Sequence, residues 1–165
     1  MATTKKPAAT AAAAKTDATA LLERDHRDVK KLFKQYEKVA DAEASGEERQ
    51  ALATQICTML TVHATVEEEI FYPAAREAEV DDDLLNEAEV EHASAKDLIA
   101  QIESMSPDDE LYDAKVTVLG EYIDHHVQEE EGEMFPKCRR AKMDLVGLAQ
   151  ELAERKSELM ADTPT

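Results

Sequence analysis

The sequence predicts an all-α protein, an up-down-up-down four-helix bundle with an additional short C-terminal helix and a flexible N-terminal tail. Three observations favour this fold class. The 165 residues include only 4 glycines and 4% aromatic residues but 34% charged residues, which is typical of helices rather than sheets. Apolar residues recur at helical spacing through four long segments. The connections between these segments are short, so neighbouring helices are expected to run antiparallel.

Four long segments and one shorter segment carry the helical spacing of apolar residues. We expect helices over residues 22–40, 52–71, 85–102, 111–123 and 145–159. The last of these is amphipathic, and it is expected to cap the bundle or to contact a partner chain. A chain of this length suits one domain with a buried core.

Helix-breaking residues mark the expected boundaries. The Ser-Gly pair at 45–46 is expected to end the first helix, and the three aspartates at 81–83 to form the next turn. Ser-Pro-Asp at 106–108 is expected to start the fourth helix, since proline fits a first helical turn. Pro73 and Pro136 are expected to kink or end their helices, because proline has no backbone N–H.

The distribution of charge separates the tail from the rest of the chain. Residues 1–20 are rich in Ala, Thr, Lys and Pro and carry three lysines against one aspartate. The formal net charge of −18 therefore leaves −20 for residues 21–165. We expect a flexible tail over residues 1–20, a bundle over 21–140 and a C-terminal amphipathic helix over 141–160.

The acidic surface and the lack of long apolar stretches argue against several function classes. A surface of this charge repels phosphate backbones, so neither nucleic acid nor an anionic membrane is an expected partner. No segment is long and apolar enough to span a bilayer, and the N-terminus lacks the apolar core of a signal peptide. Cys57 and Cys138 form no Cys-x-x-Cys pair, so we expect reduced thiols in a cytoplasmic protein.

An internal repeat carries the histidines. The strings HATVEEEIFYP, from His63, and HVQEEEGEMFP, from His126, both read His-x3-Glu-Glu-x4-Pro. The first and third helices share a second pattern, in ERDHRDVKKLFKQYE and EVEHASAKDLIAQIE, which places His26 opposite His92. The offsets are 66 residues for one pair of helices and 63 for the other, so the chain reads as one helical hairpin present twice.

Six side chains are expected to meet at one level of the bundle. Counted from the turns, the histidines of neighbouring antiparallel helices differ in height by four residues or fewer, roughly 6 Å. The i, i+4 spacing also places each repeat's histidine and glutamate on one helix face. Buried imidazoles and carboxylates at one level suit iron or manganese, whereas zinc sites usually close at four ligands. The predicted metal ligands are His26, His63, Glu67, His92, His126 and Glu130.

The polar neighbours of these ligands receive other roles. His125 lies about 100° round the helix from His126, so we expect it to contact solvent or a ligand rather than a metal. Tyr122 is expected in the core, with contact to the site as the alternative. Glu23 and Glu89 are expected to contact the histidines on the side away from the metal. A solvated face is expected for the remaining glutamates of the two strings, namely Glu68, Glu69, Glu129 and Glu131.

Taken together, these motifs resemble the hemerythrin-like HHE cation-binding family over nearly all of residues 21–160. The resemblance implies a bundle around an oxo- or hydroxo-bridged pair of non-haem iron ions, with manganese as the alternative metal. It further implies four terminal histidines and two bridging glutamates, Glu67 and Glu130. The sequence departs from the oxygen-carrying hemerythrins, which have five histidines, because Ala88 and Lys96 lie four residues either side of His92.

This departure favours some functions over others. The first hypothesis is a protein that binds or senses O2, NO or iron at the centre, as a monomer or as a weak homodimer through the C-terminal helix. The second is an enzyme, either a peroxide-decomposing protein or an oxidase. Two helices carry Glu-x2-His and the other two carry a lone Glu, which is similar to the ligand pattern of ferritin-like di-iron proteins. That pattern does not include His63 and His126. The third is a metal-free interaction bundle. A binding role is favoured over catalysis.

Overall fold

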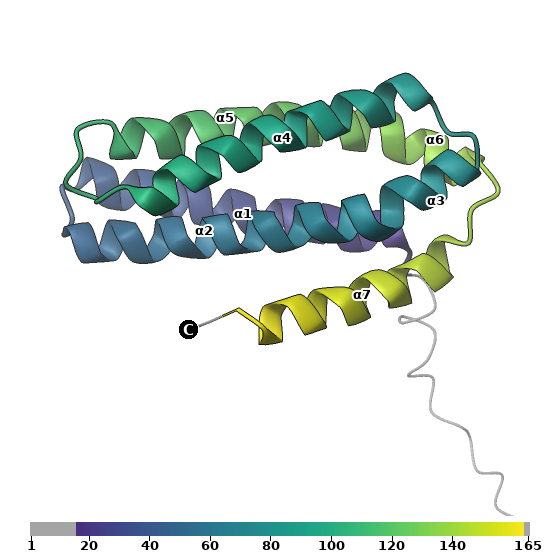
Figure 1. Cartoon of the computed structure of the whole chain (residues 1–165), viewed down its shortest axis with the longest axis horizontal. Helices are drawn as coiled ribbons and strands as arrows, with labels where there is room; N and C mark the ends of the chain where they lie inside the picture. Colours follow the sequence, from purple (N-terminus) through teal and green to yellow (C-terminus); the bar gives the residue numbers. More distant parts are fainter. Residues whose placement is uncertain (1–15, 164–165) are drawn as a thin grey trace, which may run out of the picture.

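In the computed structural model, which describes residues 16–163, four antiparallel rods enclose a common core (Figure 1). The first rod is helix α1 (Ala18–Asp41), and the second runs through α2 (Gly46–Val66), the π-helical segment η2 (Glu67–Phe71) and α3 (Tyr72–Glu77). Helix α4 (Asp82–Ser104) is the third rod. The fourth runs through α5 (Tyr112–Glu129), the π-helical segment η3 (Glu130–Met134) and α6 (Phe135–Arg140). Helix α7 (Leu145–Ala161) follows.

The predicted all-α bundle with a further C-terminal helix is confirmed, and the described residues contain no strand. Each rod packs against two others, in the cycle α1, α2, α4 and α5. Helix α7 lies outside this cycle against α1 and α2, as Figure 1 shows. None of the helices within residues 16–163 combines the length and the apolar character that crossing a bilayer requires.

Two helix boundaries differ from the prediction. Helix α1 ends at Asp41, and Glu43 then takes a left-handed backbone conformation with φ 52°. Ser45 is therefore not a stop: its side chain accepts a hydrogen bond from the backbone N–H of Glu48 and caps the start of α2. The fourth rod starts at Tyr112 rather than at residues 106–108, which form the preceding turn.

The two prolines of the repeat do not end their rods. Tyr72 N–H bonds to the carbonyl of Glu67, and Phe135 N–H bonds to that of Glu130, so each chain segment makes one wider turn. Pro73 and Pro136 then fall in the first turn of α3 and α6, where no N–H is needed. The rod continues through both prolines with a changed register, so of the two effects expected, a kink or an end, the helix end is wrong.

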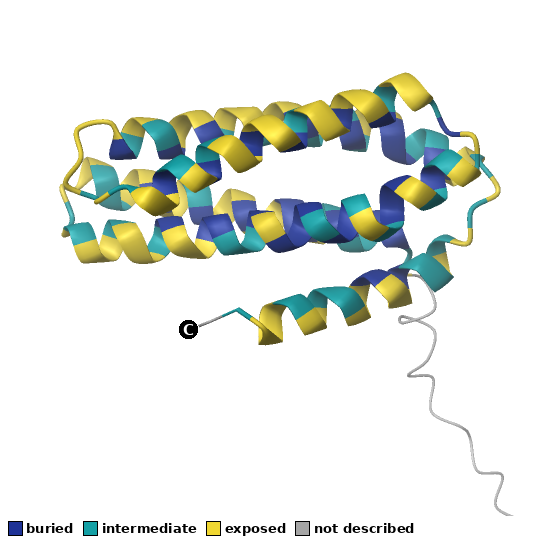
Figure 2. Ribbon diagram, in the orientation of Figure 1, coloured by how far each residue is buried: buried dark blue, intermediate teal, exposed yellow. Residues whose placement is uncertain are grey.

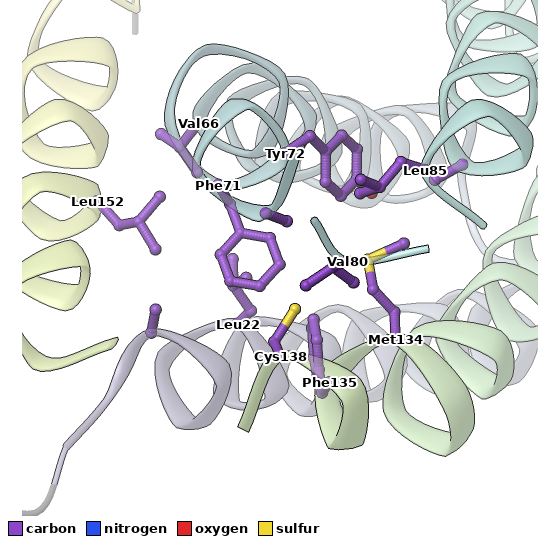
Figure 3. Packing of buried hydrophobic residues seen from close by; sticks show 13 residues of the cluster. Leu22, Val66, Phe71, Tyr72, Val80, Leu85, Met134, Phe135, Cys138 and Leu152 are labelled. Atoms are coloured by element: carbon purple, nitrogen blue, oxygen red, sulfur yellow. The ribbon is translucent and has the colours of Figure 1, made fainter. Parts of the chain in front are cut away.

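The buried residues face inward from all four rods, and the outer faces are exposed (Figure 2). The apolar core forms two clusters, one at each end of the bundle. Figure 3 shows the cluster in which Leu152 of α7 approaches Phe71 and Val66, with Phe135 and Leu22 nearby. Cys57 and Cys138 are buried free thiols. The polar layer described below lies between residues of the two apolar clusters along each rod.

The C-terminal helix packs on its own chain. Leu152 is fully buried, while Leu145, Leu148 and Leu159 are partly buried against the same cluster. Within the chain, α7 therefore covers one side of the bundle, along α1 and α2, and contact with a partner chain stays a prediction. The predicted tail falls mostly in residues 1–15, outside the described residues, and α1 already begins at Ala18.

Candidate metal centre

Four buried histidines from four different rods form two pairs inside the bundle. His26 and His63 approach each other with 3.2 Å between their Nε2 atoms, and His92 and His126 do the same at 3.2 Å. All four are buried, so their ring nitrogens have little access to bulk water. Because both members of each pair present Nε2, each pair converges on one point where an imidazole-binding cation fits.

Two glutamates lie between the histidine pairs. Glu67 Oε1 is 3.1 Å from His63 Nε2 and 3.3 Å from His92 Nε2. Glu130 Oε2 is 3.3 Å from His26 Nε2, and its Oε1 is 2.9 Å from His126 Nε2. Each glutamate thus contacts one histidine of each pair. The candidate ligand atoms form two overlapping groups of four that share both carboxylates.

The glutamate oxygens lack the partners that buried carboxylates need. Glu67 and Glu130 are almost completely buried. Both oxygens of Glu67 and Oε2 of Glu130 have no hydrogen-bond partner in the part of the chain that the structure describes. Such atoms are costly in a protein interior, whereas a bound cation would satisfy them. The six residues that the sequence brings to one level therefore lie together, and they fit a metal.

A carboxylate approaches the Nδ1 atom of each of the four buried histidines from the side away from the centre. For His26, His63 and His126 the contact is a hydrogen bond, which fixes the tautomer and leaves Nε2 free to bind a metal. These contacts follow the internal repeat, because each histidine–carboxylate pair in one half has an equivalent pair at the aligned positions of the other half. They are His26 with Glu131 at 3.1 Å, His92 with Glu68 at 3.4 Å, His63 with Asp25 at 3.0 Å and His126 with Glu91 at 3.4 Å.

These contacts correct two predictions. Glu68 and Glu131 were expected on a solvated face, but each is half-buried against a histidine, although the contact of Glu68 lacks hydrogen-bond geometry. Glu23 and Glu89 were expected behind the histidines, but they pair with Arg139 and Arg76 at the surface. The carboxylates behind the histidines are instead Asp25 and Glu91, which precede His26 and His92, and Glu68 and Glu131, which follow Glu67 and Glu130.

The structure adds a tyrosine that the sequence did not indicate. Tyr72 donates a hydrogen bond of 2.5 Å to Glu130 Oε1, and its hydroxyl lies 3.2 Å from His92 Nε2 and 3.4 Å from His126 Nε2. Burial and the charges of Glu130 and Glu67 raise its pKa well above the usual value. The available signal was the alignment of the two strings, in which Tyr72 stands opposite Phe135.

Phe135 occupies the equivalent place in the other half. Its ring stacks on His26, with ring centroids 6.0 Å apart and an angle of 2° between the planes. The position between His26 and His63 therefore has an apolar ring beside it, while the position between His92 and His126 has a hydroxyl. The two positions share a ligand type and differ in the group that covers them.

Two other candidates lie away from the centre. Tyr122 is 50% exposed, which corrects its expected place in the core. The side chain of His125 is 67% exposed, and its Nε2 is 3.2 Å from Glu129 and 3.8 Å from Glu91. His125 therefore contacts solvent and these two carboxylates. Contact with solvent was one of its two expected roles.

The carboxylates strongly affect the proton affinity of the buried groups. Burial lowers the pKa of His63, but Glu67 and Asp25 outweigh it and raise the value to about 10. For His126, Glu130 and Glu91 likewise outweigh burial and raise the pKa to about 11. Burial raises the pKa of Glu130, yet His126 and His26 hold it well below its usual value. Protons on these rings balance the buried carboxylates, and a bound cation takes over that role.

A mostly apolar cavity of about 450 Å³ reaches the centre. All four histidines line it, together with apolar side chains from the rods and two residues of α7, Lys156 and Met160. Its apolar lining includes Val29, Met59, Ile99, Ile123 and Val127. Such a lining admits a small uncharged molecule and disfavours bulk water.

Together, the bundle and its layer define a class of protein: a helical bundle whose buried histidines and glutamates form a candidate site for a cation. The chain belongs to the hemerythrin HHE cation binding domain family, whose model matches residues 17–138. The resemblance inferred from the motifs is thereby confirmed.

Two relatives place this family membership in context. A hemerythrin HHE cation binding domain-containing protein from Mycobacterium kansasii has a similar structure, with a TM-score of 0.73, 24% identity and 88% of each chain covered. A Nostoc protein named DNA nickase is 31% identical over 115 residues, which is 70% of this chain. The matched region spans only 31% of the nickase, so the likeness concerns one part of that protein.

Proposed function

We propose that the centre binds two iron ions, with manganese as the alternative metal, and that the protein binds or senses O2, NO or iron in the cytoplasm. His26 and His63 hold one ion, and His92 and His126 hold the other. Glu67 and Glu130 bridge them. The observation that carries this proposal is the pair of four-residue ligand groups that share both glutamates.

The donor set favours iron or manganese over zinc. Each position is offered two imidazole nitrogens and oxygens of two carboxylates, a mixture that suits a borderline metal with room for a further ligand. Bound iron supplies electrons to an oxidant such as O2 or peroxide. The chain's own residues hold the ligands through their outer carboxylates and present an apolar cavity that excludes bulk water.

The test is an anaerobic iron count followed by an absorption spectrum on adding O2. We expect about two irons per chain and a new charge-transfer band in the near-ultraviolet to visible region. His126→Ala should lose iron, whereas the adjacent His125→Ala should retain it. Protein from iron-rich medium that contains no metal would instead favour an interaction bundle.

Enzymatic decomposition of hydrogen peroxide is the alternative function, and one observation favours it. The Tyr72 hydroxyl lies beside the position between His92 and His126 and donates to Glu130, whereas the aromatic ring beside the other position, that of Phe135, carries no hydroxyl. In the reaction, two molecules of peroxide become two of water and one of O2. Sustained O2 release from peroxide, lowered in Tyr72→Phe, would support this function; stoichiometric oxidation without turnover would exclude it.

DNA cleavage is not part of the proposal. The formal net charge of −18 repels a phosphate backbone, and the matched region is less than a third of the nickase. Dimerisation through α7 stays a prediction, to be tested by the concentration dependence of the sedimentation coefficient.

A further inference from the structure

Helix α7 places a lysine next to the centre. Leu152 anchors this helix in the core, and Lys156 lies one turn further on the same side. The Nζ atom of Lys156 is 2.5 Å from Asp25 Oδ1. The preceding residue, Arg155, points elsewhere and pairs with the exposed Glu69. Two neighbouring cations of one helix therefore have separate partners.

Asp25 connects this lysine to a histidine of the centre. Only 7% of its side chain is exposed, and its second oxygen, Oδ2, accepts the Nδ1–H of His63 at 3.0 Å. Both carboxylate oxygens are thus engaged in charged hydrogen bonds, which are short and directional. These two consecutive hydrogen bonds, from Lys156 to Asp25 and from His63 to Asp25, hold the imidazole so that its Nε2 faces the centre.

The other half of the bundle has the carboxylate but not the lysine. Glu91 stands opposite Asp25 in the repeat and contacts His126 Nδ1 at the longer distance of 3.4 Å. The ion pairs of Glu91 within residues 16–163 are with His125 and His126 alone. Glu91 is also more exposed than Asp25, because α7 covers α1 and α2 rather than this face.

We propose that Lys156 is a positioning residue that fixes Asp25 and, through it, His63, so that α7 strengthens metal binding at the position between His26 and His63. The inference rests on the proposed two-metal function. It assigns the C-terminal helix a role in tuning one metal position, whereas the other position relies on Glu91 without such support. Outer hydrogen-bond partners of metal-binding histidines commonly change metal affinity by 10- to 100-fold.

The experiment compares Lys156→Met with Arg155→Met in the full-length protein by anaerobic titration with Co2+ against a competing chelator. Two binding steps are expected in the wild type. Lys156→Met should weaken one step roughly threefold to tenfold, less than the loss of a direct partner, and leave the other within about twofold. Arg155→Met should leave both steps unchanged. Lys156→Arg, which keeps a cationic donor, should restore most of the affinity.

A double-mutant cycle separates positioning from simple docking of the helix. Asp25→Asn should weaken the same step, and adding Lys156→Met to it should have little further effect, because the lysine acts through the aspartate. In the Co2+-loaded protein, the shifted Nδ1–H resonance of one histidine should exchange faster with solvent in Lys156→Met. A structural role alone would not single out one resonance.

The outcomes distinguish this inference from the function on which it rests. Equal binding steps in the wild type and Lys156→Met would overturn the role of Lys156 and leave the two-metal centre intact. Equal weakening by Arg155→Met would also overturn it, because docking of α7 would then be the cause. A wild type that binds fewer than two Co2+ ions would contradict the proposed function itself.

Discussion

The two halves of the bundle repeat the same ligands in different surroundings. In the half formed by α1 and α2, α7 covers the outer face, and Val62 and Val66 are buried beneath it. In the half formed by α4 and α5, the equivalent positions hold His125 and Glu129 on an open face. The two halves thus share the residues that meet inside the bundle. Their outer faces differ: the positions that α7 covers are apolar, and the equivalent open positions are polar.

The same contrast extends to the centre. Tyr72 comes from the α2 rod but reaches the histidines of α4 and α5, whereas its counterpart Phe135 stacks on His26. A duplicated set of ligands can therefore form two metal positions that are not equivalent. The difference comes from the side chains that surround the ligands and not from the ligands themselves.

Loss of either shared glutamate should have the largest effect, and the effect should be similar in both halves. Glu67→Ala and Glu130→Ala each remove a carboxylate that contacts one histidine of each pair. Since this exceeds the loss of an outer partner, affinity for the metal pair should fall more than about 100-fold. Iron counts per chain after anaerobic loading measure this. Retention of two irons in either variant would contradict the bridging role; Glu129→Gln is the control.

Truncation of α7's anchor should separate the covered face from the open one. Leu152→Ala removes a fully buried side chain, which should lower the free energy of unfolding by about 2–5 kcal/mol. Val90→Ala, on the open face at 67% exposure, should change it by less than about 0.5 kcal/mol. Urea denaturation measures both. Equal losses would show that the open face is covered in solution.

Removal of the tyrosine hydroxyl should make the two positions more alike. Tyr72→Phe deletes a buried hydrogen bond to a carboxylate, so the free energy of unfolding should fall by about 1.5–3 kcal/mol. Two irons should still bind, because the phenol is not one of the six ligands. Tyr122→Phe, at an exposed site, is the control and should leave stability unchanged. A normal stability for Tyr72→Phe would mean that the hydrogen bond is absent.

Raising the pH should destabilise the chelator-treated protein through one histidine of each half. The pKa values of His63 and His126 are raised from 6.5 to about 10 and about 11, so the stabilisation is complete below about pH 6.5 and is lost as the pH rises through those values. The urea midpoint should therefore be lower at pH 9.5 than at pH 7. Metal-loaded protein should not show this fall. Glu130, whose pKa is lowered, keeps its stabilising contribution at neutral and alkaline pH and loses it only as the pH falls well below 4.5.

The sequence predicts the rods and the meeting of the six ligands because both depend on helical periodicity. His63 with Glu67 and His126 with Glu130 are spaced by one turn, and the short turns set their heights. Polar side chains within apolar stripes needed partners, and the repeat supplied the same residue types on opposite rods. These features survive errors of a few residues in the helix ends.

The surroundings of the ligands could not be predicted in the same way. The π-helical turns that begin at Glu67 and Glu130 change the helical phase, so a regular spacing does not place Glu68, Glu131 or Tyr72 correctly. Periodicity also marks an apolar face without saying what covers it. Tyr122 followed the apolar spacing of its helix and is nevertheless exposed, because α7 packs on the opposite half.

The central claim is that two metal ions share Glu67 and Glu130 between two histidine pairs. Anomalous diffraction from crystals of the iron-loaded protein, measured at the iron edge, tests it most directly. The account predicts two peaks about 3.5–4 Å apart, one beside His26 and His63 and the other beside His92 and His126. A single peak, or peaks only at the exposed His125, would contradict it.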